Sequence, residues 1–420
     1  MADIPADGTT EIRAADGVPL KVALGRAQAR ARRRAFLLVL PLLAFVMITF
    51  VIPIGQMLHR SMHNPVFPDN MPAVIAWFEA NPPGTEPDEA AFEALASDLA
   101  SAAAARTIGS VGTRVNYEMG GTRSLFTAAG RRAADLEPPF REALVELNPT
   151  WGSRELWVTM RNVSSAYTAN FYLAAIDRVR DIEGRIAPVA DDRAIYLLLF
   201  ERTFVLSALI TLLCLALGFP IAHLLATLPL RYSNLLMILV LLPFWTSLLV
   251  RTTAWMAILQ SQGVLNNALV GLGIISDEGR VQLMYNQAGT VIAMTHILLP
   301  FMVLPLYSVM RTINPSYVRA ARSLGATSWT AFRRVYLPQT LPGIGAGSLL
   351  VFILAVGYYI TPALVGGASG QLISNLIAFH MQNSLNWSCA AALATLLLAA
   401  VLVLYWLYDR LVGIDNMKLT

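Results

Sequence analysis

Six apolar blocks, each about long enough to cross a lipid bilayer, constrain this sequence more than any other feature. A transmembrane helix needs about 20 predominantly apolar residues. With 56% hydrophobic and 14% charged residues, the chain also has too little polar surface to cover a water-soluble globule. We therefore expect an all-α integral membrane protein with six transmembrane helices. The blocks are residues 35–54, 203–226, 234–250, 288–309, 344–365 and 390–407.

The first block follows a cluster of arginines between Arg26 and Arg34. A basic flank before an apolar run also occurs in secretory signal peptides. This run is longer than the apolar region of such a peptide and lacks a small-residue cleavage site. We interpret it as an uncleaved first span that follows a cytoplasmic N-terminus.

Basic residues in the loops support an alternating topology, because they concentrate on the cytoplasmic side of a membrane. Arg231 follows the second block, and five arginines from Arg311 to Arg334 follow the fourth. Arg410 and Lys418 follow the sixth block. This pattern places both termini and two loops in the cytoplasm, as in a multi-pass protein of the bacterial inner membrane.

The segment between the first two blocks differs in composition from the rest of the chain. Residues 58–193 contain 18 of the 27 acidic residues but only 13 of the 31 basic ones. Alanine-rich periodic runs at 88–105 and 137–147 predict helices joined by short loops. We expect a folded, helical extracytoplasmic insert, which either docks a partner protein or only stabilises the outer face. Its predicted small core draws on Trp77, Phe92, Phe126, Phe140, Trp151, Trp157, Phe171 and Tyr172.

The expected organisation has five parts, and the polar residues up to Pro19 lack periodicity and are predicted to be disordered. The parts are a cytoplasmic tail (1–34), a first transmembrane helix (35–57), the insert (58–195), a core containing spans two to six (196–410) and a second cytoplasmic tail (411–420).

Energy coupling and cofactors are constrained by what the sequence lacks. The phosphate-binding loop of ATPases requires a lysine after its glycine-rich turn, and the only lysines are Lys21 and Lys418, in other contexts. Cys214, Cys389 and five scattered histidines have no metal-site spacing, and His296 is expected to be a packing residue. We therefore expect no cofactor or metal on this chain.

A segment after the fourth block has the signals of a helix, a turn and a second helix. Asn314 is a good N-cap with Pro315 after it, and Gly325 is a good helix stop. Thr327 or Ser328 can cap a second short helix, which we expect Pro338 to end. Such a segment could be an amphipathic connector whose arginines touch anionic lipid.

The residues of this segment favour a more specific interpretation. Ala320 and Ala321 are followed by Gly325, Val335, Leu337 and Pro338 at the intervals of the EAA loop of binding-protein-dependent ABC importer permeases, so residues 314–343 resemble that loop. Arg319 stands where the family usually has glutamate, which leaves open any ion pair of that glutamate with the ATPase. The resemblance implies that these seven residues attach the chain to an ATPase.

Other segments resemble the spermidine/putrescine-type permeases within that family. They are Leu217–Ala222, Leu242–Ser247 with Arg251, Gly263–Asn266 and Leu299–Tyr307. The resemblance implies the MetI-like helical bundle of type I importer permeases. It also implies a dimer of ATPase subunits that use ATP, a second permease subunit of a different sequence and an extracytoplasmic solute-binding protein. Membrane lipid is a further partner, and nucleic acid is not.

The substrate path is expected near the outer ends of the third and fifth blocks. We end the third block at Val250, because extending it through Trp255 would place Arg251 in hydrocarbon at a cost of about 2.5–3.5 kcal/mol. Arg251 then acts as an interfacial anchor or a solute ligand. Gly343 and Gly347 should allow close helix packing. The path candidates, which also suit an interfacial aromatic belt, are Trp245, Arg251, Trp255, Tyr358, Tyr359 and Thr361.

The function that we infer from the sequence is import of a small organic solute, polyamine-like or another small nitrogen compound. The alternative is an ion-coupled secondary transporter that works without an ATPase. Such carriers usually place ionisable residues inside the bundle, whereas Glu201 and Asp409 lie just outside the blocks here. The permease itself is expected to perform no covalent chemistry.

Overall fold

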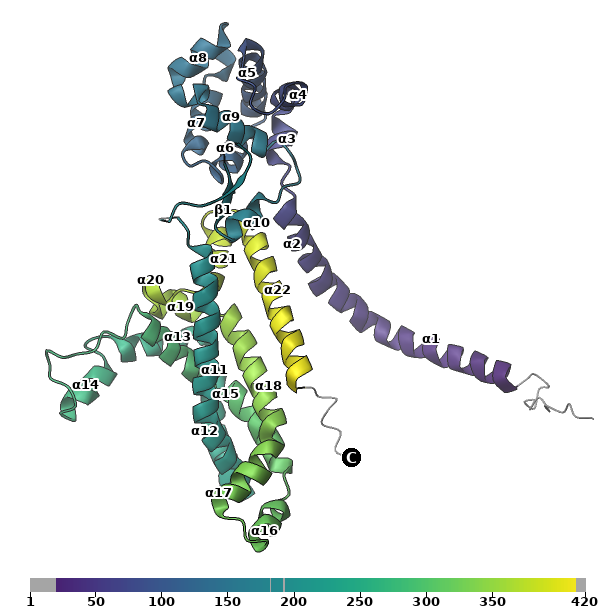
Figure 1. Cartoon of the computed structure of the whole chain (residues 1–420), viewed down its shortest axis with the longest axis vertical. Helices are drawn as coiled ribbons and strands as arrows, with labels where there is room; N and C mark the ends of the chain where they lie inside the picture. Colours follow the sequence, from purple (N-terminus) through teal and green to yellow (C-terminus); the bar gives the residue numbers. More distant parts are fainter. Residues whose placement is uncertain (1–19, 182, 192, 413–420) are drawn as a thin grey trace, which may run out of the picture. The chain divides into compact units, whose positions relative to one another are not determined.

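The computed structural model describes residues 20–412 except 182 and 192, in two units that divide after His59 (Figure 1). The predictions for residues 1–19, for Lys418 and for the rest of 413–420 lie outside the described residues. The first unit is helical, and the stretch Ala27–Met62 contains an 18-residue window with a mean hydropathy of 2.9 and has exposed apolar side chains. The unit comprises α1 (Leu20–Val46), the π-helical turn η1 (Met47–Val51) and most of α2 (Ile52–Met62), whose last three residues lie beyond the division.

The helices of the core follow the insert. Four of them are long and apolar enough to span a membrane, which makes five with the N-terminal helix. The core contains α11 (Tyr196–Thr227), α12 (Leu230–Leu241), the 3₁₀ turn η4 (Leu242–Trp245), α13 (Leu248–Leu259), α14 (Val264–Gly271), α15 (Gln287–Thr312), α16 (Pro315–Ser323), α17 (Ser328–Ala331), the π-helical turn η5 (Phe332–Tyr336), α18 (Leu337–Gly357), α19 (Ile360–Val365), α20 (Gly367–Gly370), α21 (Ile373–Gln382) and α22 (Trp387–Val412).

A continuous third span over residues 234–250 was the wrong expectation. Leu230–Trp245 and Leu248–Gly271 form a pair bent by 95°, which gives a sixth span if the pair is counted as one. The break follows from local chemistry. Pro243 cannot donate a backbone hydrogen bond, and the Ser247 hydroxyl caps a new helix by accepting from the Val250 N–H at 3.2 Å. Arg251 consequently lies in the first turn of α13, not beyond the end of a span.

The fifth span also ends earlier than expected. Helix α18 stops at Gly357, and Tyr358 has an extended backbone, so residues 360–365 form the separate short helix α19. At its other end, α18 continues back through η5 and α17, so Ser328–Gly357 is one helical stretch. This span therefore includes residues that we assigned to a loop.

Helices α11, α15 and α18 lie side by side and form the centre of the core (Figure 1). A β-carbon built on Gly343 would lie 3.2 Å from Leu306 Cα, and one on Gly347 would lie 2.8 Å from Met302 Sδ. Both neighbours belong to α15. The predicted role of this glycine pair in close packing is confirmed, because a β-carbon at either position would come within 3.2 Å of the α15 backbone.

The insert consists of short helices around its own apolar core and a small antiparallel hairpin that pairs Arg178 with Pro188. Phe92, Phe126 and Trp151 are wholly buried there. The hairpin is the one β element among the described residues of a mainly helical chain. The elements are α3 (Val66–Asn70), α4 (Pro72–Ala80), α5 (Glu89–Ala104), α6 (Ile108–Asn116), α7 (Thr122–Gly130), the 3₁₀ turn η2 (Ala133–Asp135), α8 (Phe140–Leu147), the 3₁₀ turn η3 (Pro149–Gly152), α9 (Arg154–Asn162), α10 (Asn170–Ala175), β1 (Arg178–Arg180) and β2 (Ile186–Pro188).

One buried carboxylate caps a distant helix inside the insert. Asp98, on α5, accepts hydrogen bonds from the backbone N–H groups of Ala73 at 3.2 Å and Val74 at 2.8 Å, at the start of α4. Burial raises the pKa of the Asp98 carboxyl above its ordinary value, while the two N–H donors act in the opposite direction. The carboxylate thus fixes α4 against α5.

The last helix of the insert, α10, packs with the membrane helices and not with the apolar core of the insert. Phe171 and Ala175 of α10 pack with Leu199 of α11 and Cys389 of α22, so the assignment of Phe171 to the insert core was wrong. Tyr172 packs against this same cluster. The Asp177 carboxylate accepts three backbone N–H groups at the start of α11, the shortest from Leu197 at 2.7 Å. The insert is thereby fixed to the first turn of α11.

Candidate functional site

Residues 314–338, which we call the arginine turn, begin with a helix whose ends match the sequence signals. The Asn314 side chain accepts a hydrogen bond from the Ser316 N–H at 3.0 Å and so caps α16. The helix ends at Ser323, and Gly325, two residues later, has a φ of +90°. The N–H groups of Gly325 and Ala326 donate to the carbonyls of Arg322 and Ala321 at 3.0 and 3.1 Å, which is the Schellman pattern. The turn therefore depends on the left-handed backbone that glycine adopts at little cost.

The second helix of the arginine turn does not end at Pro338, contrary to the prediction from sequence. The Thr327 hydroxyl caps α17 by accepting from the Thr330 N–H at 3.2 Å, as expected. The helix then widens into the π turn η5 and continues as α18. Proline has no N–H to donate to the carbonyl four residues earlier, and the wider π register accommodates this loss. The second helix of the arginine turn is consequently continuous with α18.

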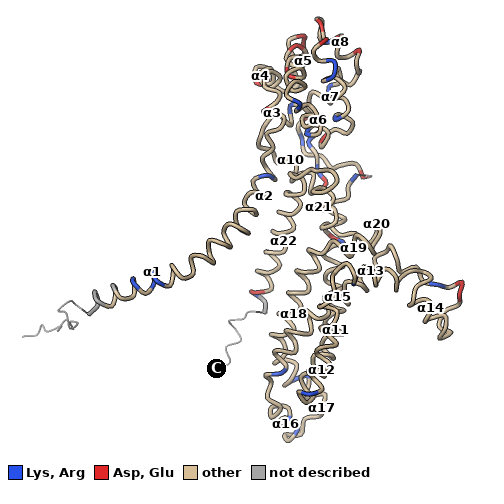
Figure 2. Tube along the Cα trace, turned by 180° about the vertical axis from the view of Figure 1, so that it is seen from behind, with Lys and Arg blue, Asp and Glu red and all other residues tan. Residues whose placement is uncertain are grey.

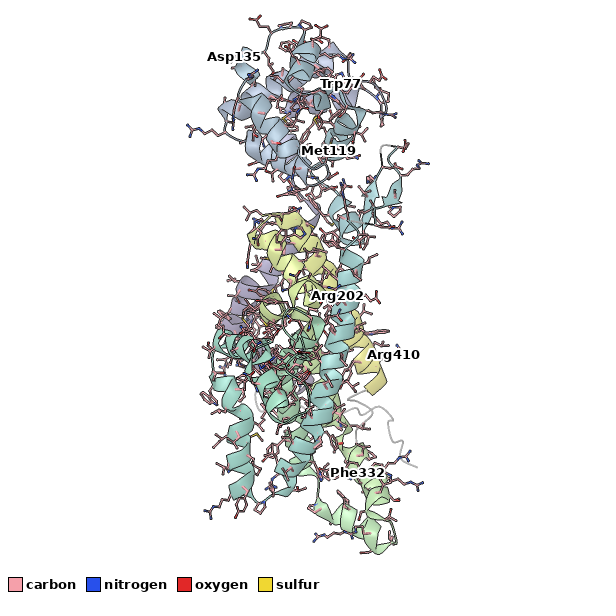
Figure 3. All side chains as sticks on the ribbon, turned by 90° about the vertical axis from the view of Figure 1, so that its left-hand side faces the viewer. Trp77, Met119, Asp135, Arg202, Phe332 and Arg410 are labelled. Carbon is pink, nitrogen blue, oxygen red and sulfur yellow. The ribbon has the colours of Figure 1, made fainter. Side chains whose placement is uncertain are left out.

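A row of aromatic side chains connects the arginine turn to α11. The rings of Trp329, Phe332 and Tyr336 stack in sequence, with centroids 5.7 and 5.8 Å apart. Phe332, labelled in Figure 3, also packs edge-on against Phe219 of α11 at 6.1 Å. The Tyr336 hydroxyl hydrogen-bonds His223 Nδ1 at 2.9 Å. These contacts hold the base of the turn against the last turns of α11.

The outer surface of the arginine turn carries exposed apolar side chains among exposed arginines. Leu324 is 89% exposed and Trp329 is 68% exposed, although both are large and apolar. Figure 2 shows the turn with basic and without acidic positions. Within the part of the chain that the structure describes, its arginines make no ion pair. They are Arg319, Arg322, Arg333 and Arg334.

The other residues predicted to attach an ATPase vary in exposure. Ala320 and Pro338 are exposed, whereas Ala321, Val335 and Leu337 are half-buried. Ala320 and Ala321 lie on α16 and add little bulk beside Arg319. A partner could approach the α16 backbone closely on this side.

Four of the six predicted path residues come together between α13, α15 and the segment after α18. Arg251 lies close enough to interact electrostatically with Tyr358 and with His296 of α15. The Trp255 indole N–H donates to His296 Nδ1 at 3.1 Å. Tyr358 also contacts Thr361. We call these residues, with Thr252, the membrane cluster.

The membrane cluster is rich in hydrogen-bond donors. One amino group of the Arg251 guanidinium donates to the Thr246 carbonyl at 3.1 Å, and Arg251 Nε is buried without an acceptor among the described residues. The Thr252 and Thr361 hydroxyls meet at 3.1 Å. Carboxylates are absent from this set, which can therefore hydrogen-bond an acceptor group more readily than it can balance an added positive charge.

The remaining two path candidates lie apart from the membrane cluster. Trp245 ends η4 and is 86% exposed. Tyr359 is 39% exposed, and its carbonyl accepts from the Asn375 amide at 2.7 Å. Sequence reasoning missed Thr252, although its position directly after Arg251 was a usable signal. His296 indeed packs within the bundle, but it does so through a specific hydrogen bond to Trp255.

Comparison with known proteins shows which family the core of the chain resembles. Residues 215–413 match the family model of binding-protein-dependent transport system inner membrane components. The spermidine/putrescine transport system permease protein PotB of Escherichia coli strain K12 is 39% identical over 206 residues, which are 48% of this chain and 74% of that protein. PotB of Haemophilus influenzae is 36% identical over 211 residues, which are 50% of this chain and 73% of that protein.

A solved structure, that of a bacterial alginate ABC transporter in complex with an alginate pentasaccharide-bound periplasmic protein, is 21% identical. The match covers 51% of this chain and 77% of that one, with a TM-score of 0.45. The two permease relatives carry the assignment, because this chain covers more than two thirds of each at 36–39% identity. The chain belongs to the family of binding-protein-dependent transport system inner membrane components.

Proposed function

We propose that this chain is a transmembrane permease subunit of an ATP-driven importer and that the arginine turn is its contact with the ATPase. The observation that carries this proposal is the rigid connection between the turn and α18. An exposed turn with an apolar apex needs a partner to cover it. The continuous helix Ser328–Gly357 would carry any movement of the turn into the bundle.

The proposed complex contains two ATPase subunits that use ATP, a second permease subunit of a different sequence and an extracytoplasmic solute-binding protein. The arginine turn then faces the cytoplasm, where arginines concentrate, and both termini lie on that side. On this model the insert (58–195) is extracytoplasmic. Residues 35–57 form the first span, and residues 196–410 form the permease core.

Alternating access follows from the way the turn is held. When the ATPases close on ATP, they would move the arginine turn as a rigid body. Trp329, Phe332 and Tyr336 form a stacked row that ends against α11, so α18 and α11 would move together. The membrane cluster lies where α13, α15 and the segment after α18 meet, so the same movement would change its access to either side.

The cognate ATPase should present an acidic cleft. Four exposed arginines without ion pairs among the described residues surround Leu324 and Trp329, so a matching surface needs carboxylates around an apolar pocket. Arg319 stands where a glutamate is usual in the resembling family. We propose that Arg319 pairs with an acid of the partner, in contrast to a loop that carries glutamate.

The solute is proposed to be a polyamine-like or other small nitrogen compound. The names of the PotB relatives support a polyamine. The donor-rich membrane cluster supports a solute of lower positive charge, because ammonium groups are held by carboxylates and aromatic faces. Spermidine added as a competitor to the reconstituted importer separates these two classes of solute. An importer of polyamines should lose uptake of its own solute when spermidine is present. An importer of the other nitrogen compounds should retain that uptake.

The experiment that tests the import proposal compares the native chain with Gly325→Asp in co-purification with its ATPase. The aspartate adds a side chain and a negative charge beside Leu324, at a contact that we propose needs positive charge, so the turn should lose the ATPase. Gly184→Asp is a matched control, because Gly184 also has a positive φ (+78°) and no neighbour within 4 Å, but lies in the insert. A second variant enlarges Ala320 and Ala321 to leucine.

Loss of the ATPase from both turn variants but not from the control supports the proposal. A native chain that binds no ATPase, yet transports when reconstituted alone, would instead be an ion-coupled secondary transporter.

A further inference from the structure

The insert contains a hollow that the import proposal does not use. It has a volume of about 890 Å³ and lies between α7, α8 and η3. Pockets that bind small organic molecules measure about 300–1,000 Å³. The hollow lies outside residues 215–413, the part that matches the transport family. Its ligand must therefore be inferred from its own side chains.

A buried indole N–H in the wall of this hollow lacks an acceptor. Trp151 lines the hollow and is wholly buried, and its Nε1 has no hydrogen-bond partner in the described part of the chain. The other indole of this core is satisfied, because Trp157 Nε1 donates to the Trp151 carbonyl at 2.8 Å. A buried donor without a partner costs about 1–3 kcal/mol. This N–H has no accessible surface in the structure, so a ligand oxygen would reach it only after the side chains in front of it moved.

The charged side chains of the wall also favour an acceptor. Arg131 and Arg132 are exposed in the wall, and neither makes an ion pair or side-chain hydrogen bond among the described residues. Glu146 is the one acidic residue of the wall. Gly121, which precedes α7, also lines the hollow and places the positive end of the helix dipole there. The wall thus has a net positive charge and a surplus of donors.

We propose that this hollow binds a small organic molecule that carries a carboxylate. The two guanidinium groups would hold the carboxylate by charge-assisted hydrogen bonds, which are the strong ones. The volume exceeds what an inorganic anion fills, and the excess positive charge disfavours a polyamine. Glu146 would in addition meet an ammonium group if the ligand is an amino acid.

The test measures binding to the full-length chain in nanodiscs, without an ATPase, by titration calorimetry with succinate, glutamate and putrescine at constant ionic strength. The variant Arg131→Gln/Arg132→Gln changes two exposed side chains and should fold. Arg154→Gln is the matched control, since Arg154 is an exposed arginine of the insert outside the hollow. Trp151→Phe keeps an aromatic ring but removes the N–H, and its thermal unfolding is measured in parallel.

We expect succinate or glutamate to bind, and the double arginine variant to weaken binding about tenfold or more, which corresponds to losing one charge-assisted hydrogen bond. The control should leave the affinity unchanged. If the hollow is suited to a zwitterionic ligand, Glu146→Gln should weaken the binding of glutamate but not that of succinate. If it is suited to a simple carboxylate, the same variant should strengthen the binding of both.

Three results would overturn the proposal: neither carboxylate binds, Arg154→Gln weakens binding as much as the double variant does, or putrescine alone binds. Because binding is measured without an ATPase or transport, these results leave the import proposal untouched. Equally, an importer that fails its ATPase test could still bind a carboxylate in the insert.

Discussion

Two carboxylates and one glycine show how single residues position the larger parts of this protein. Asp98 and Asp177 each accept backbone N–H groups at the start of a helix that lies far from them in the sequence. They therefore act as N-caps supplied by another element, and they neutralise the positive end of a helix. Gly325 has the complementary role at a helix end, where its positive φ closes the Schellman turn.

The capping role of Asp98 predicts a pH effect on stability. Burial raises the pKa of its carboxyl in the folded state, so the folded protein binds this proton more tightly than the unfolded chain does. Its contribution to the free energy of unfolding should fall as the pH rises from about 4 through the folded pKa. We expect the stability of the native chain, relative to Asp98→Asn, to increase on acidification.

Thermal unfolding of the two proteins in detergent at several pH values measures this difference. Asparagine retains the shape of aspartate but does not titrate. If the relative stability of the native chain decreased on acidification, the ionised form would be the one that stabilises the fold. Asp98→Ala should cost about 1–3 kcal/mol, because the Ala73 and Val74 N–H groups would lose their acceptor.

The positive φ of Gly325 predicts an order among its variants. Asparagine tolerates the left-handed region better than other residues with a β-carbon, and β-branched residues tolerate it least. We expect Gly325→Asn to retain most of the bound ATPase, Gly325→Ala to lose part of it and Gly325→Val to lose nearly all. Quantitative pull-down of the three variants gives the order. If Gly325→Ala retained more ATPase than Gly325→Asn, bulk and not backbone conformation would matter at this position.

Two π turns in this chain share one sequence setting. The turn η1 ends at Val51 and η5 ends at Tyr336, and in each case a proline, Pro53 or Pro338, stands two residues later. Each π turn absorbs a missing backbone donor and lets a helix continue through a proline. The same device occurs in the first span and at the base of the arginine turn.

Removing Pro338 should therefore change the direction in which the arginine turn points. With an alanine at position 338, the π turn can return to regular α-helix. This change removes one extra residue from the turn, so the preceding helix rotates by about 100° relative to α18. Trp329 would leave its place in the aromatic row. We expect Pro338→Ala to reduce ATP-driven uptake about tenfold or more, a loss comparable to that from misplacing a positioned group, with little change in thermal stability.

Pro53→Ala is the matched control, because Pro53 follows a π turn in the first span, which belongs to a different unit from the arginine turn. If the two variants reduced uptake to the same extent, the effect would belong to proline removal in general. Uptake into proteoliposomes and ATPase retention are measured for both.

How far the sequence predicts each element depends on whether local chemistry decides it. The ends of α16 followed from Asn314 and Gly325 because a cap and a positive φ are local requirements. The start of α17 followed from Thr327 in the same way, but its end did not, because Pro338 normally stops a helix and nothing local signals a π turn. The 95° bend after α12 was missed for a related reason, since apolar content hides a break that Pro243 and Ser247 create. The electrostatic interaction of Arg251 with Tyr358 depends on tertiary packing, and the sequence gives no signal for it.

Charge is distributed unevenly over the molecule as a whole. Acidic positions concentrate in the insert, and the arginine turn has none, as Figure 2 shows. Between Glu278 and Asp409 the sequence contains no acidic residue. This region includes α15, the arginine turn and α18. A partner of the turn must therefore supply all the negative charge at that contact.

Reversing charge on the turn tests that requirement. We expect Arg319→Glu/Arg322→Glu to abolish co-purification of the ATPase, and lysine substitution of an acid in the ATPase cleft to restore it partly. Native binding should weaken as ionic strength rises, because exposed charges are screened. The control is Arg178→Glu/Arg180→Glu, which makes the same change of charge on the exposed strand β1. If the turn variant retained the ATPase but lost a dependence of uptake on anionic lipid that the native chain shows, the arginines would serve the membrane surface instead.

Helix α11 touches both distant contact regions of the second unit. Its first turns pack with α10 of the insert, and its last turns pack with Phe332 and Tyr336 of the arginine turn. At 1.5 Å per residue its 32 residues extend for about 48 Å without a described break. Thermodynamic linkage then applies to whatever occupies the two regions: if docking at the insert shifts this helix and so changes the affinity for ATP tenfold, ATP must change the strength of that docking by the same factor.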